Sequence, residues 1–212
     1  MDARFIALEG IDGSGTTTQT VRLREAITAR GARCVGTFEP TRGPVGSIIR
    51  LALNGRLLFS PPPSGAAGEE SLYALLFAAD RLDHLFNEIE PALRAGSFVV
   101  SDRYYLSSFA YQSLGCDLAW LRQLNSRCRR PDATFLLDAD PRVCLDRIEH
   151  DRHGRDRYED LKKLQAIRDN YLRIADVLRA DGEEIVVVDG THPIDRVHAE
   201  IVAGLKALHF IP

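Results

Sequence analysis

Lysine is scarce in this 212-residue sequence, in which only Lys162, Lys163 and Lys206 occur, so arginine supplies nearly all the positive charge. Cysteine is also sparse. The four cysteines are widely scattered: Cys34, Cys116, Cys128 and Cys144. The sequence contains no C-x-x-C pair and no histidine at the spacing of zinc ligands, which argues against a structural zinc site. The cysteines are therefore expected to be reduced.

The sequence also lacks a strong excess of either charge and any long apolar run. Its formal net charge is −3 and its sequence pI is about 6.1, so no general basic field is present to attract nucleic acid. No apolar stretch approaches membrane-spanning length, and the first apolar segment follows Met1 without the pattern of a signal peptide. We expect a cytoplasmic protein with neither a nucleic-acid nor a membrane partner.

Length and composition are those of one folded domain over residues 1–212, since 45% of the residues are hydrophobic and 27% charged. Short apolar runs alternate with segments of helical spacing, which predicts parallel strands joined by helices in a three-layer α/β fold. The expected strands are residues 5–8, 34–38, 98–102, 133–138 and 185–188. The expected helices are residues 17–30, 45–58, 69–94, 107–112, 118–130, 161–179 and 194–208.

Residues 5–19 form the stretch around which the chain is organised. An apolar run predicts a buried strand, and Gly10, Gly13 and Gly15 follow it in a turn that leads into a helix. Such a turn points backbone N–H groups inward at the positive end of the helix and so makes a cradle for phosphate oxygens. Gly10, Gly15 and Thr17 match the phosphate-binding loop G-x-x-x-x-G-K-[ST] except at the lysine position.

Thr16 occupies the position of that lysine. The lysine normally brings positive charge to the β- and γ-phosphates, so threonine removes a charge where negative charge must be stabilised. The loop alone leaves two interpretations open. It is either a phosphate-binding loop with altered chemistry or a glycine-rich turn that only packs a helix on a sheet.

Charged residues follow two of the expected strands. Asp102 ends the strand 98–102, which is how phosphate-loop enzymes place a carboxylate near magnesium. Arg42 lies in the turn after strand 34–38, and ligands gather at the carboxyl ends of strands in open α/β sheets. Arg42 either binds an anion or is a solvated loop arginine.

Two segments carry side chains suited to a flat polar ligand. Phe77 and Arg81 lie four residues apart on the expected helix 69–94, so they share a face and can hold a ring by stacking and hydrogen bonding. The alternative is an ordinary core aromatic. The segment 107–112, Ser-Ser-Phe-Ala-Tyr-Gln, opens a helix rich in side-chain donors, which is unusual for plain core.

Residues 142–159 are densely charged. Their arginines include Arg147, Arg152, Arg155 and Arg157. Alternating charges are typical of a solvated helix face. The other interpretation is a mobile lid that closes over phosphates and supplies guanidinium groups, whose planar forks match phosphoryl oxygens.

Taken together, these segments resemble the thymidylate kinase family of nucleoside monophosphate kinases over nearly the whole chain. The motifs that carry the resemblance are, in order, Glu9-Gly10-Ile11-Asp12-Gly13-Ser14-Gly15, Glu39-Pro40, Phe77-Ala78-Ala79-Asp80-Arg81, Asp102-Arg103-Tyr104, Ser107 with Ala110-Tyr111-Gln112, Pro131-Asp132 and Asp156-Arg157-Tyr158-Glu159. Several ordered motifs are far more specific than the loop alone. The resemblance implies the P-loop nucleoside monophosphate kinase fold, with a central parallel sheet and a mobile lid at 142–159.

The resemblance also implies a reaction, the transfer of the γ-phosphoryl group of ATP to dTMP with Mg²⁺, which gives dTDP for dTTP synthesis. Carried over by position, the ATP-binding residues are Gly10, Gly13, Ser14, Gly15, Thr16, Thr17 and Thr18. The metal-binding residues are Thr17 and Asp102. The dTMP-binding residues are Asp12, Glu39, Arg42, Phe77, Arg81, Arg103, Ser108, Tyr111 and Gln112. The catalytic residues are Asp12, Asp102, Arg103, Arg152, Arg155 and Arg157.

Within the acceptor set, the resemblance assigns separate parts of dTMP to separate residues. Phe77 would stack on thymine and Arg81 would bond its carbonyl edge. Ser108 and Gln112 lie where the family reads the rest of the base. Tyr111 would fill the space that a ribose 2′-hydroxyl needs, which favours deoxyribose.

The chain departs from the family at two positions in its predicted phosphate-binding segments. Arg103, and less surely Arg42, would bind the acceptor phosphate, but Phe38 stands where many bacterial members have arginine. Because Thr16 replaces the loop lysine and residues 12–14 offer no cation, the chain looks like the type that carries its basic residues in the lid. We expect the lid arginines to compensate in part for the missing lysine.

Two other functions remain open from the sequence. One is a kinase for another deoxynucleotide or a nucleoside, and the other is a nucleotide-binding protein whose catalysis is weakened by the loss of the lysine. Family members are commonly homodimers, and an apolar helix face within residues 69–90 is the surface expected to serve. The sequence determines neither the preference for ATP over GTP nor the role of the proline-rich loop 60–68.

Overall fold

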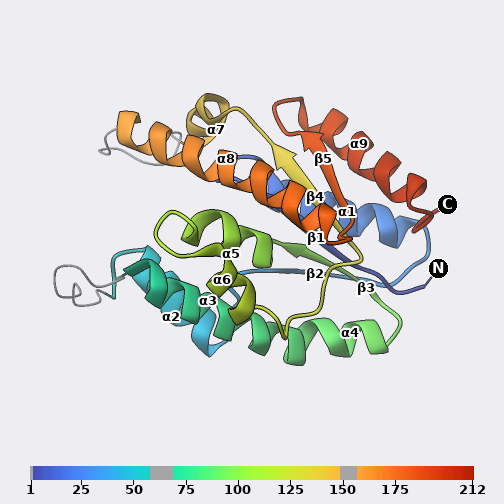
Figure 1. Cartoon of the computed structure of the whole chain (residues 1–212). Helices are drawn as coiled ribbons and strands as arrows, with labels where there is room; N and C mark the ends of the chain where they lie inside the picture. Colours follow the sequence, from blue (N-terminus) through green and yellow to red (C-terminus); the bar gives the residue numbers. More distant parts are fainter. Residues whose placement is uncertain (1, 58–68, 149–156) are drawn as a thin grey trace.

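The computed structural model describes residues 2–57, 69–148 and 157–212 and contains a five-stranded, fully parallel sheet. Its strands run in the order β2-β3-β1-β4-β5 (Figure 1). Their bounds are Phe5–Gly10 (β1), Cys34–Phe38 (β2), Phe98–Asp102 (β3), Ala133–Asp138 (β4) and Ile185–Asp189 (β5). The predicted strands and the α/β class are confirmed.

Helices cover both faces of the sheet (Figure 1). Their bounds are Thr16–Ala29 (α1), Pro44–Leu53 (α2), Glu69–His84 (α3), Leu85–Ile89 (the π-helical turn η1), Glu90–Arg94 (α4), Tyr105–Gln112 (α5), Leu118–Leu124 (α6), Pro141–Ile148 (α7), Arg157–Ala180 (α8) and Ile194–Ala207 (α9). Helices α1 and α9 pack on one face, and α3, α5, α6, α7 and α8 pack on the other. The architecture is therefore three-layered.

The central strand β1 shows how the sequence assigns its side chains to the two layers. Phe5 and Ala7 belong to the core cluster under α5 and α8, whereas Ile6 and Leu8 belong to the cluster under α1 and α9. This alternation follows from the two-residue period of a strand. Glu9 continues the series of Phe5 and Ala7, so a carboxyl group points from the strand toward α5 and α8.

The strand register brings the functional segments to one edge of the sheet. Leu8 lies beside Asp102 of β3, and Gly10 lies beside Leu137 of β4. Because all strands are parallel, the loop after β1 and the acidic end of β3 meet at their carboxyl ends. This edge is where the site is built.

The expected helix 69–94 is divided in the structure. It runs as α3, widens into the π-helical turn Leu85–Ile89, and continues as α4. Pro91 lies just after the wide turn, and proline in a regular helix removes a hydrogen bond and clashes with the carbonyl four residues earlier. The π turn accommodates that proline without ending the helical segment.

Two other predicted helices are too long. The predicted helix 45–58 ends as α2 at Leu53, before a turn in which Gly55 has a φ of 66°. The predicted helix 118–130 ends as α6 at Leu124. Glycine readily adopts a left-handed conformation that other residues avoid, so Gly55 explains why α2 ends early.

The predicted lid 142–159 overlaps two helices. Its first residues belong to α7, where Cys144 and Leu145 are buried, and its last residues open α8. Residues 149–156, including Arg152 and Arg155, lie outside the described residues, as does the proline-rich loop 60–68. Within the described part of the chain, no helix has the length and apolar character needed to cross a membrane.

Candidate active site

The loop after β1 has the geometry of an anion cradle. Gly13 and Gly15 have φ values of 81° and 99°, in the left-handed region that favours glycine. A Cβ atom on Gly13 would lie 2.5 Å from the carbonyl oxygen of Cys144 in α7, so only glycine fits there. Helix α1 begins at Thr16, and no side chain caps its first N–H groups, which leaves them directed at the loop.

A cavity of about 920 Å³ opens onto this loop. Besides the loop residues, it is lined by Asp102, Arg103, Arg147 and the segment 190–194 that connects β5 to α9. Six of the seven residues predicted to bind ATP line it: Gly13, Ser14, Gly15, Thr16, Thr17 and Thr18. The seventh, Gly10, is the last residue of β1 and is not among the lining residues. We refer to it below as the donor cavity, after the predicted ATP-binding residues that line it.

Arg147 of α7 lies against the loop that lacks the lysine. Its Nη1 donates to the carbonyl oxygens of Gly13 at 3.2 Å and Gly190 at 3.0 Å, and its Nη2 donates to that of Thr191 at 3.4 Å. The guanidinium group therefore bridges the phosphate loop and the β5–α9 segment, and it adds positive charge to the wall of the donor cavity.

Thr17 and Asp102 form a pair of oxygen ligands suited to magnesium. The Thr17 hydroxyl donates to Asp102 Oδ2 at 2.5 Å, while Asp102 Oδ1 is buried and has no hydrogen-bond partner among the described residues. A buried carboxylate oxygen with no partner is costly unless a ligand completes it. Among the described residues no cluster of three or more metal-binding side chains occurs, and Mg²⁺ characteristically takes one or two protein oxygens with phosphates and water. The pair fits that ion.

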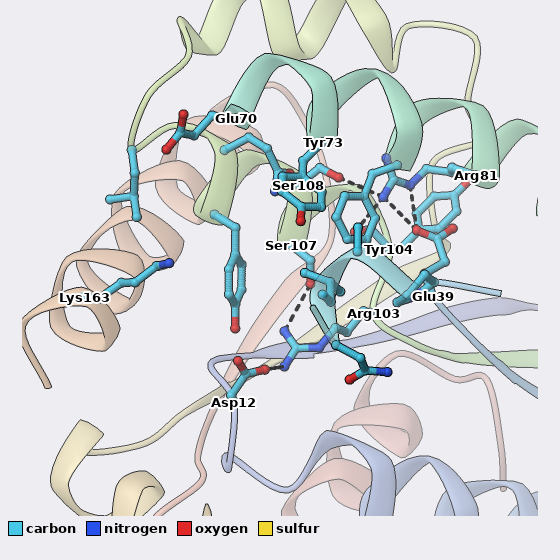
Figure 2. A pocket seen from close by; sticks show the side chains of 18 of the residues that line it. Asp12, Glu39, Glu70, Tyr73, Arg81, Arg103, Tyr104, Ser107, Ser108 and Lys163 are labelled. Carbon is cyan, nitrogen blue, oxygen red and sulfur yellow. Dashed lines mark hydrogen bonds and ion pairs between the residues drawn. The ribbon is translucent and has the colours of Figure 1, made fainter. Parts of the chain in front are cut away.

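A second cavity, of about 1030 Å³, opens between α3, α5 and α8 (Figure 2). Its walls contain most of the residues predicted to bind the acceptor: Asp12, Glu39, Phe77, Arg81, Arg103, Ser108, Tyr111 and Gln112. Glu70, Tyr73 and Lys163 also line it, and none of these three was predicted from the sequence. Asp12, Glu39 and Arg103 line both cavities, so the two sites meet at these residues.

Arg103 is held where the cavities meet. Its Nη1 donates to the carbonyl of Gly10 at 2.6 Å, and its Nη2 donates to Asp12 Oδ1 at 2.7 Å (Figure 2). The guanidinium carbon lies 5.5 Å from the centre of the Tyr111 ring. A planar cation fixed in this way presents a fork that matches phosphate oxygens.

Behind Arg103 lies a buried hydrogen-bonded cluster around Glu9, which the sequence analysis did not assign to the site. Glu9 is 0% exposed and accepts hydrogen bonds from the Ser107 hydroxyl, the Tyr171 hydroxyl and the Tyr104 N–H. Burial raises the pKa of the Glu9 carboxyl to about 7, and the hydrogen bond from Ser107 opposes that rise. An acidic residue at the end of an apolar strand was the signal that could have revealed it.

Arg81 is buried in an ion pair. Its Nε and Nη2 both donate to Glu39 Oε2, at 2.9 and 2.7 Å, its Nη1 donates to Asn125, and its Nη2 also donates to Ser108. With only 1% of the side chain exposed, little donor capacity remains for a base. The structure shows Arg81 holding Glu39 and contacting Ser108 at the wall of the acceptor cavity, and its contact with a base stays a prediction.

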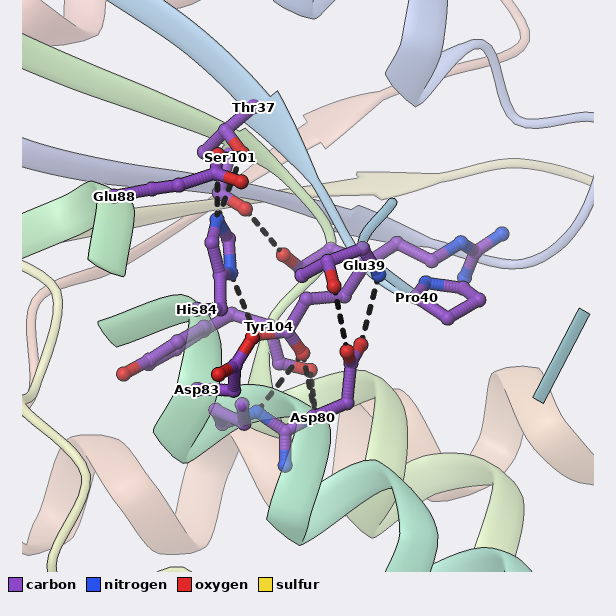
Figure 3. Close-up of polar contacts among 12 residues, drawn as sticks. Thr37, Glu39, Pro40, Asp80, Asp83, His84, Glu88, Ser101 and Tyr104 are labelled. Atoms are coloured by element: carbon purple, nitrogen blue, oxygen red, sulfur yellow. Dashed lines mark hydrogen bonds and ion pairs between the residues drawn. The ribbon is translucent and has the colours of Figure 1, made fainter. Parts of the chain in front are cut away.

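His84 extends this buried cluster to Thr37 of β2 (Figure 3). Its ring contacts Glu39 Oε1 at 3.1 Å through Nδ1 and the Thr37 hydroxyl at 2.7 Å through Nε2. Asp80 accepts hydrogen bonds from the N–H and hydroxyl of Thr41. Asp80, Arg81 and His84 thus hold the 39–41 loop from one face of α3.

Arg42 does not reach either cavity. It is exposed, and its guanidinium lies over the ring of Phe38, 5.5 Å from the ring centre. The prediction that Arg42 binds the acceptor phosphate is not supported by this geometry, because a cation–π contact outside the pocket satisfies the side chain.

Arg157 is the first residue of α8.

A parallel sheet that carries a phosphate loop after its central strand, with an acceptor pocket opening onto that loop, is the arrangement of a nucleoside monophosphate kinase. The chain belongs to the thymidylate kinase family, because the family model described as Thymidylate kinase matches residues 8–201. The chain is similar to proteins named probable thymidylate kinase from three organisms. The Thermococcus kodakarensis protein is 40% identical over 96% of this chain and 98% of its own length. The Pyrococcus horikoshii protein is 39% identical over 97% of each chain, and the Pyrobaculum calidifontis protein is 38% identical over 95% of each.

Proposed function

We propose that this enzyme transfers the γ-phosphoryl group of ATP to the phosphate of dTMP, which yields ADP and dTDP. The observation that carries the proposal is that the donor and acceptor cavities share Asp12, Glu39 and Arg103. Phosphoryl transfer needs alignment of donor and acceptor more than covalent help, and a shared boundary supplies that alignment.

The chain's own residues divide the work between the two substrates. The backbone N–H groups of the loop and of the first turn of α1 bind the phosphates of ATP. Thr17 and Asp102 hold Mg²⁺, which supplies positive charge to the phosphate oxygens when bound. Arg103, fixed by Asp12 and Gly10, binds the acceptor phosphate and stabilises the charge that develops during transfer.

The polar groups of the acceptor pocket suit thymine better than cytosine. Arg81 donates to Ser108 Oγ at 2.9 Å, so the Ser108 hydroxyl hydrogen is left to donate into the pocket. Gln112 lies one turn further along α5, and its Oε1 is buried with no hydrogen-bond partner in the part of the chain that the structure describes. Thymine presents a carbonyl acceptor beside an N–H donor, which matches this donor and acceptor. Cytosine presents the reverse pattern at the same edge.

The direct test is ADP production by the purified protein with ATP, Mg²⁺ and each of dTMP, dUMP, dCMP, dGMP, dAMP and UMP. Turnover that is fastest with dTMP supports the proposal. Fastest turnover with another deoxynucleotide would establish the first alternative. Binding of ATP and dTMP without turnover would establish a nucleotide-binding protein weakened by Thr16.

Replacing Ser108 with alanine is expected to lower the selectivity for dTMP over dCMP. The variant loses a hydrogen bond to the base, so kcat/KM for dTMP should fall about tenfold while that for dCMP changes little. Steady-state kinetics with both nucleotides measure the ratio. Ser126→Ala, at an exposed serine, is the matched control. Unchanged kinetics with dTMP in Ser108→Ala would contradict the assignment.

Replacing Arg147 with methionine is expected to lower kcat by about 10²-fold. We propose that Arg147 shares with Arg152, Arg155 and Arg157 the task of the missing lysine, and removal of one electrostatic donor to the transition state has an effect of this size. Adding Thr16→Lys to the Arg147→Met variant should restore most of the turnover. Arg173→Met, at an exposed arginine of α8, serves as the control.

Full turnover in Arg147→Met would contradict this role of Arg147. An alanine series at Arg152, Arg155 and Arg157 tests the remaining cations separately. If none of these changes reduces turnover, compensation by arginine is wrong as a whole.

We also propose that two copies of the chain associate through α3 and η1. Leu75 and Phe86, which are 50% and 64% exposed, lie three helical turns apart on one face, and α2 packs beside α3 with Ile48 and Leu51 exposed. A cluster of exposed apolar side chains on a protein surface marks an interaction site. In a twofold-symmetric dimer, both copies contribute the same patch.

Phe86→Glu is expected to convert a dimer of about twice the 23.6 kDa chain mass into a monomer. Burying two opposed carboxylates in the interface is unfavourable, so the equilibrium shifts toward separate chains. Sedimentation or light scattering measures the mass. Val21→Glu, at an exposed apolar residue of α1, is the control. A parent protein that is monomeric would contradict the proposed association.

A further inference from the structure

The backbone of Arg103 adopts an unusual conformation, with a φ of 72°. Only two described residues other than glycine have a positive φ, and the second, His209, is near the C-terminus. This left-handed region is unfavourable for a residue with a side chain and persists only where the surroundings hold it. The residue that joins the two cavities is therefore strained, and something must fix it.

The peptide bond between Arg103 and Tyr104 is held at both of its polar atoms. Its carbonyl oxygen accepts a hydrogen bond from the Ser101 hydroxyl at 2.7 Å. Its N–H donates to Glu9 Oε1 at 2.9 Å. The N–H of Arg103 itself donates to the Leu8 carbonyl at 2.8 Å. These contacts come from β1 and from the end of β3, which are rigid elements of the sheet.

Glu9 also reaches the side chain of Arg103 through two hydroxyl groups. Ser107 donates to Glu9 Oε2 at 2.5 Å, and Tyr171 donates to the same oxygen at 3.2 Å. Arg103 Nη1 lies 3.4 Å from Ser107 Oγ and 3.2 Å from the Tyr171 oxygen. One carboxyl group thus constrains both the backbone and the guanidinium of Arg103.

Neither Glu9 nor Ser101 is placed to touch a substrate. Both are 0% exposed, and neither lines the donor or the acceptor cavity. Any effect that they have on the reaction must therefore pass through the cavity-lining residues that they contact, which are Arg103, Tyr104 and Ser107, and of these only Arg103 carries a charge. This distinguishes them from Asp12, which contacts Arg103 but is exposed at the boundary of the two cavities.

We propose that Glu9 and Ser101 are positioning residues that clamp the Arg103–Tyr104 peptide in its strained conformation and thereby set where the Arg103 guanidinium meets the acceptor phosphate. The inference rests on the proposed function for its kinetic consequence. The clamp itself is a statement about conformation and holds for any acceptor nucleotide.

The kinetic test first compares single variants at Ser101 and Glu9 and then combines Ser101→Ala with changes at Arg103 and Arg147. Ser101→Ala removes one hydroxyl, and Glu9→Ala removes the carboxyl. Each is expected to raise KM for the acceptor nucleotide about tenfold and to leave KM for ATP within about twofold, because the proposed function assigns Arg103 to the acceptor phosphate and not to the phosphates of ATP. Glu9→Gln keeps an oxygen for the Tyr104 N–H and an amide for the two hydroxyls, so it should recover most of the loss.

Coupling to Arg103 separates positioning from a general loss of stability. In an Arg103→Lys background, Ser101→Ala should add less than a twofold further loss, because the fork that it aligns is already gone. In an Arg147→Met background, which affects the donor side, the same change should keep its full tenfold effect. Full additivity with Arg103→Lys, or equal effects on KM for ATP, would overturn the proposal.

The conformation of Arg103 is read independently of activity from crystal structures of Ser101→Ala and Glu9→Gln. We expect φ at residue 103 to leave the left-handed region in Ser101→Ala and to remain there in Glu9→Gln. An unchanged φ in Ser101→Ala would refute the clamp. If dTMP proves not to be the substrate, the cycle is measured with the monophosphate that turns over fastest. Absence of all turnover would remove the proposed function, and the crystal structures would still decide the clamp.

Discussion

Arg103→Met is expected to lower kcat/KM for dTMP by about 10³-fold. Methionine matches much of the apolar stem of arginine but carries no charge, so the change removes the cation that both cavities share. Single electrostatic donors to a transition state typically contribute 10²–10³-fold, and arginines that stabilise a transferring phosphoryl group contribute still more.

The partition between kcat and KM identifies what Arg103 does. If it binds the phosphate of dTMP equally in the ground and transition states, KM alone rises. We expect both constants to change, because the guanidinium lies between the acceptor pocket and the phosphate loop, held by Asp12 and by the Gly10 carbonyl.

Arg103→Lys is expected to lie between the parent and Arg103→Met, because lysine keeps the charge but not the planar fork. Arg127→Met, at an exposed arginine, is the control for the loss of a cation elsewhere. The free energy of unfolding of Arg103→Met should be close to that of the parent. The side chain of Asp12, which loses its ion-pair partner, is 61% exposed, so water can solvate its carboxylate. A decrease of less than tenfold in kcat/KM would contradict the role assigned to Arg103.

Arg81→Met is expected to lower the free energy of unfolding by about 3–5 kcal/mol. Arg81 and Glu39 are 1% and 2% exposed, and their closest atoms are 2.7 Å apart. Removing one partner of a buried pair leaves an uncompensated buried charge, which is strongly destabilising. The remaining neighbour, His84, contacts the other oxygen of Glu39 but cannot replace the two-pronged hydrogen bond of the guanidinium.

A second substitution tests this explanation. Arg81→Met with Glu39→Leu removes both charges, so most of the lost stability should return even though activity does not. Arg22→Met is the control, because Arg22 and Asp195 form an ion pair of similar length, 2.6 Å, with side chains 34% and 88% exposed. Exposed pairs contribute little, so that variant should lose less than about 1 kcal/mol.

Urea unfolding of the four proteins measures these differences. A loss below about 1 kcal/mol in Arg81→Met would mean that the buried pair does not hold the 39–41 loop. Failure of the double variant to recover would mean that Glu39 is needed for a reason other than charge balance, such as its contact with His84.

The sheet and the phosphate loop were predictable because their signals are local. A run of four to six apolar residues bounded by turn residues indicates a buried strand wherever it occurs. Glycines at fixed spacing indicate a backbone that curls around an anion, and an acid at the end of an apolar strand indicates a ligand at the sheet edge. All five strands and the place of Asp102 at the end of β3 follow from such patterns.

The helix ends were less predictable because two of them depend on special backbone. Proline at 91 is tolerated through a π-helical turn, and the glycine at 55 closes α2 five residues early. Periodicity reports which face of a helix is apolar but not where its hydrogen bonding changes.

The sequence by itself determined the fold class and the family and pointed to many of the residues that line the two cavities. Only the tertiary structure decided how those residues are paired. Arg81 meets Glu39 from 42 positions away, Glu9 meets Tyr171 from 162 positions away, and Arg147 reaches Gly13 across 134 positions. The physical reason is that patterns along the chain record local conformation. The partner of a buried charge is set by the strand order β2-β3-β1-β4-β5, which brings distant segments together at one edge.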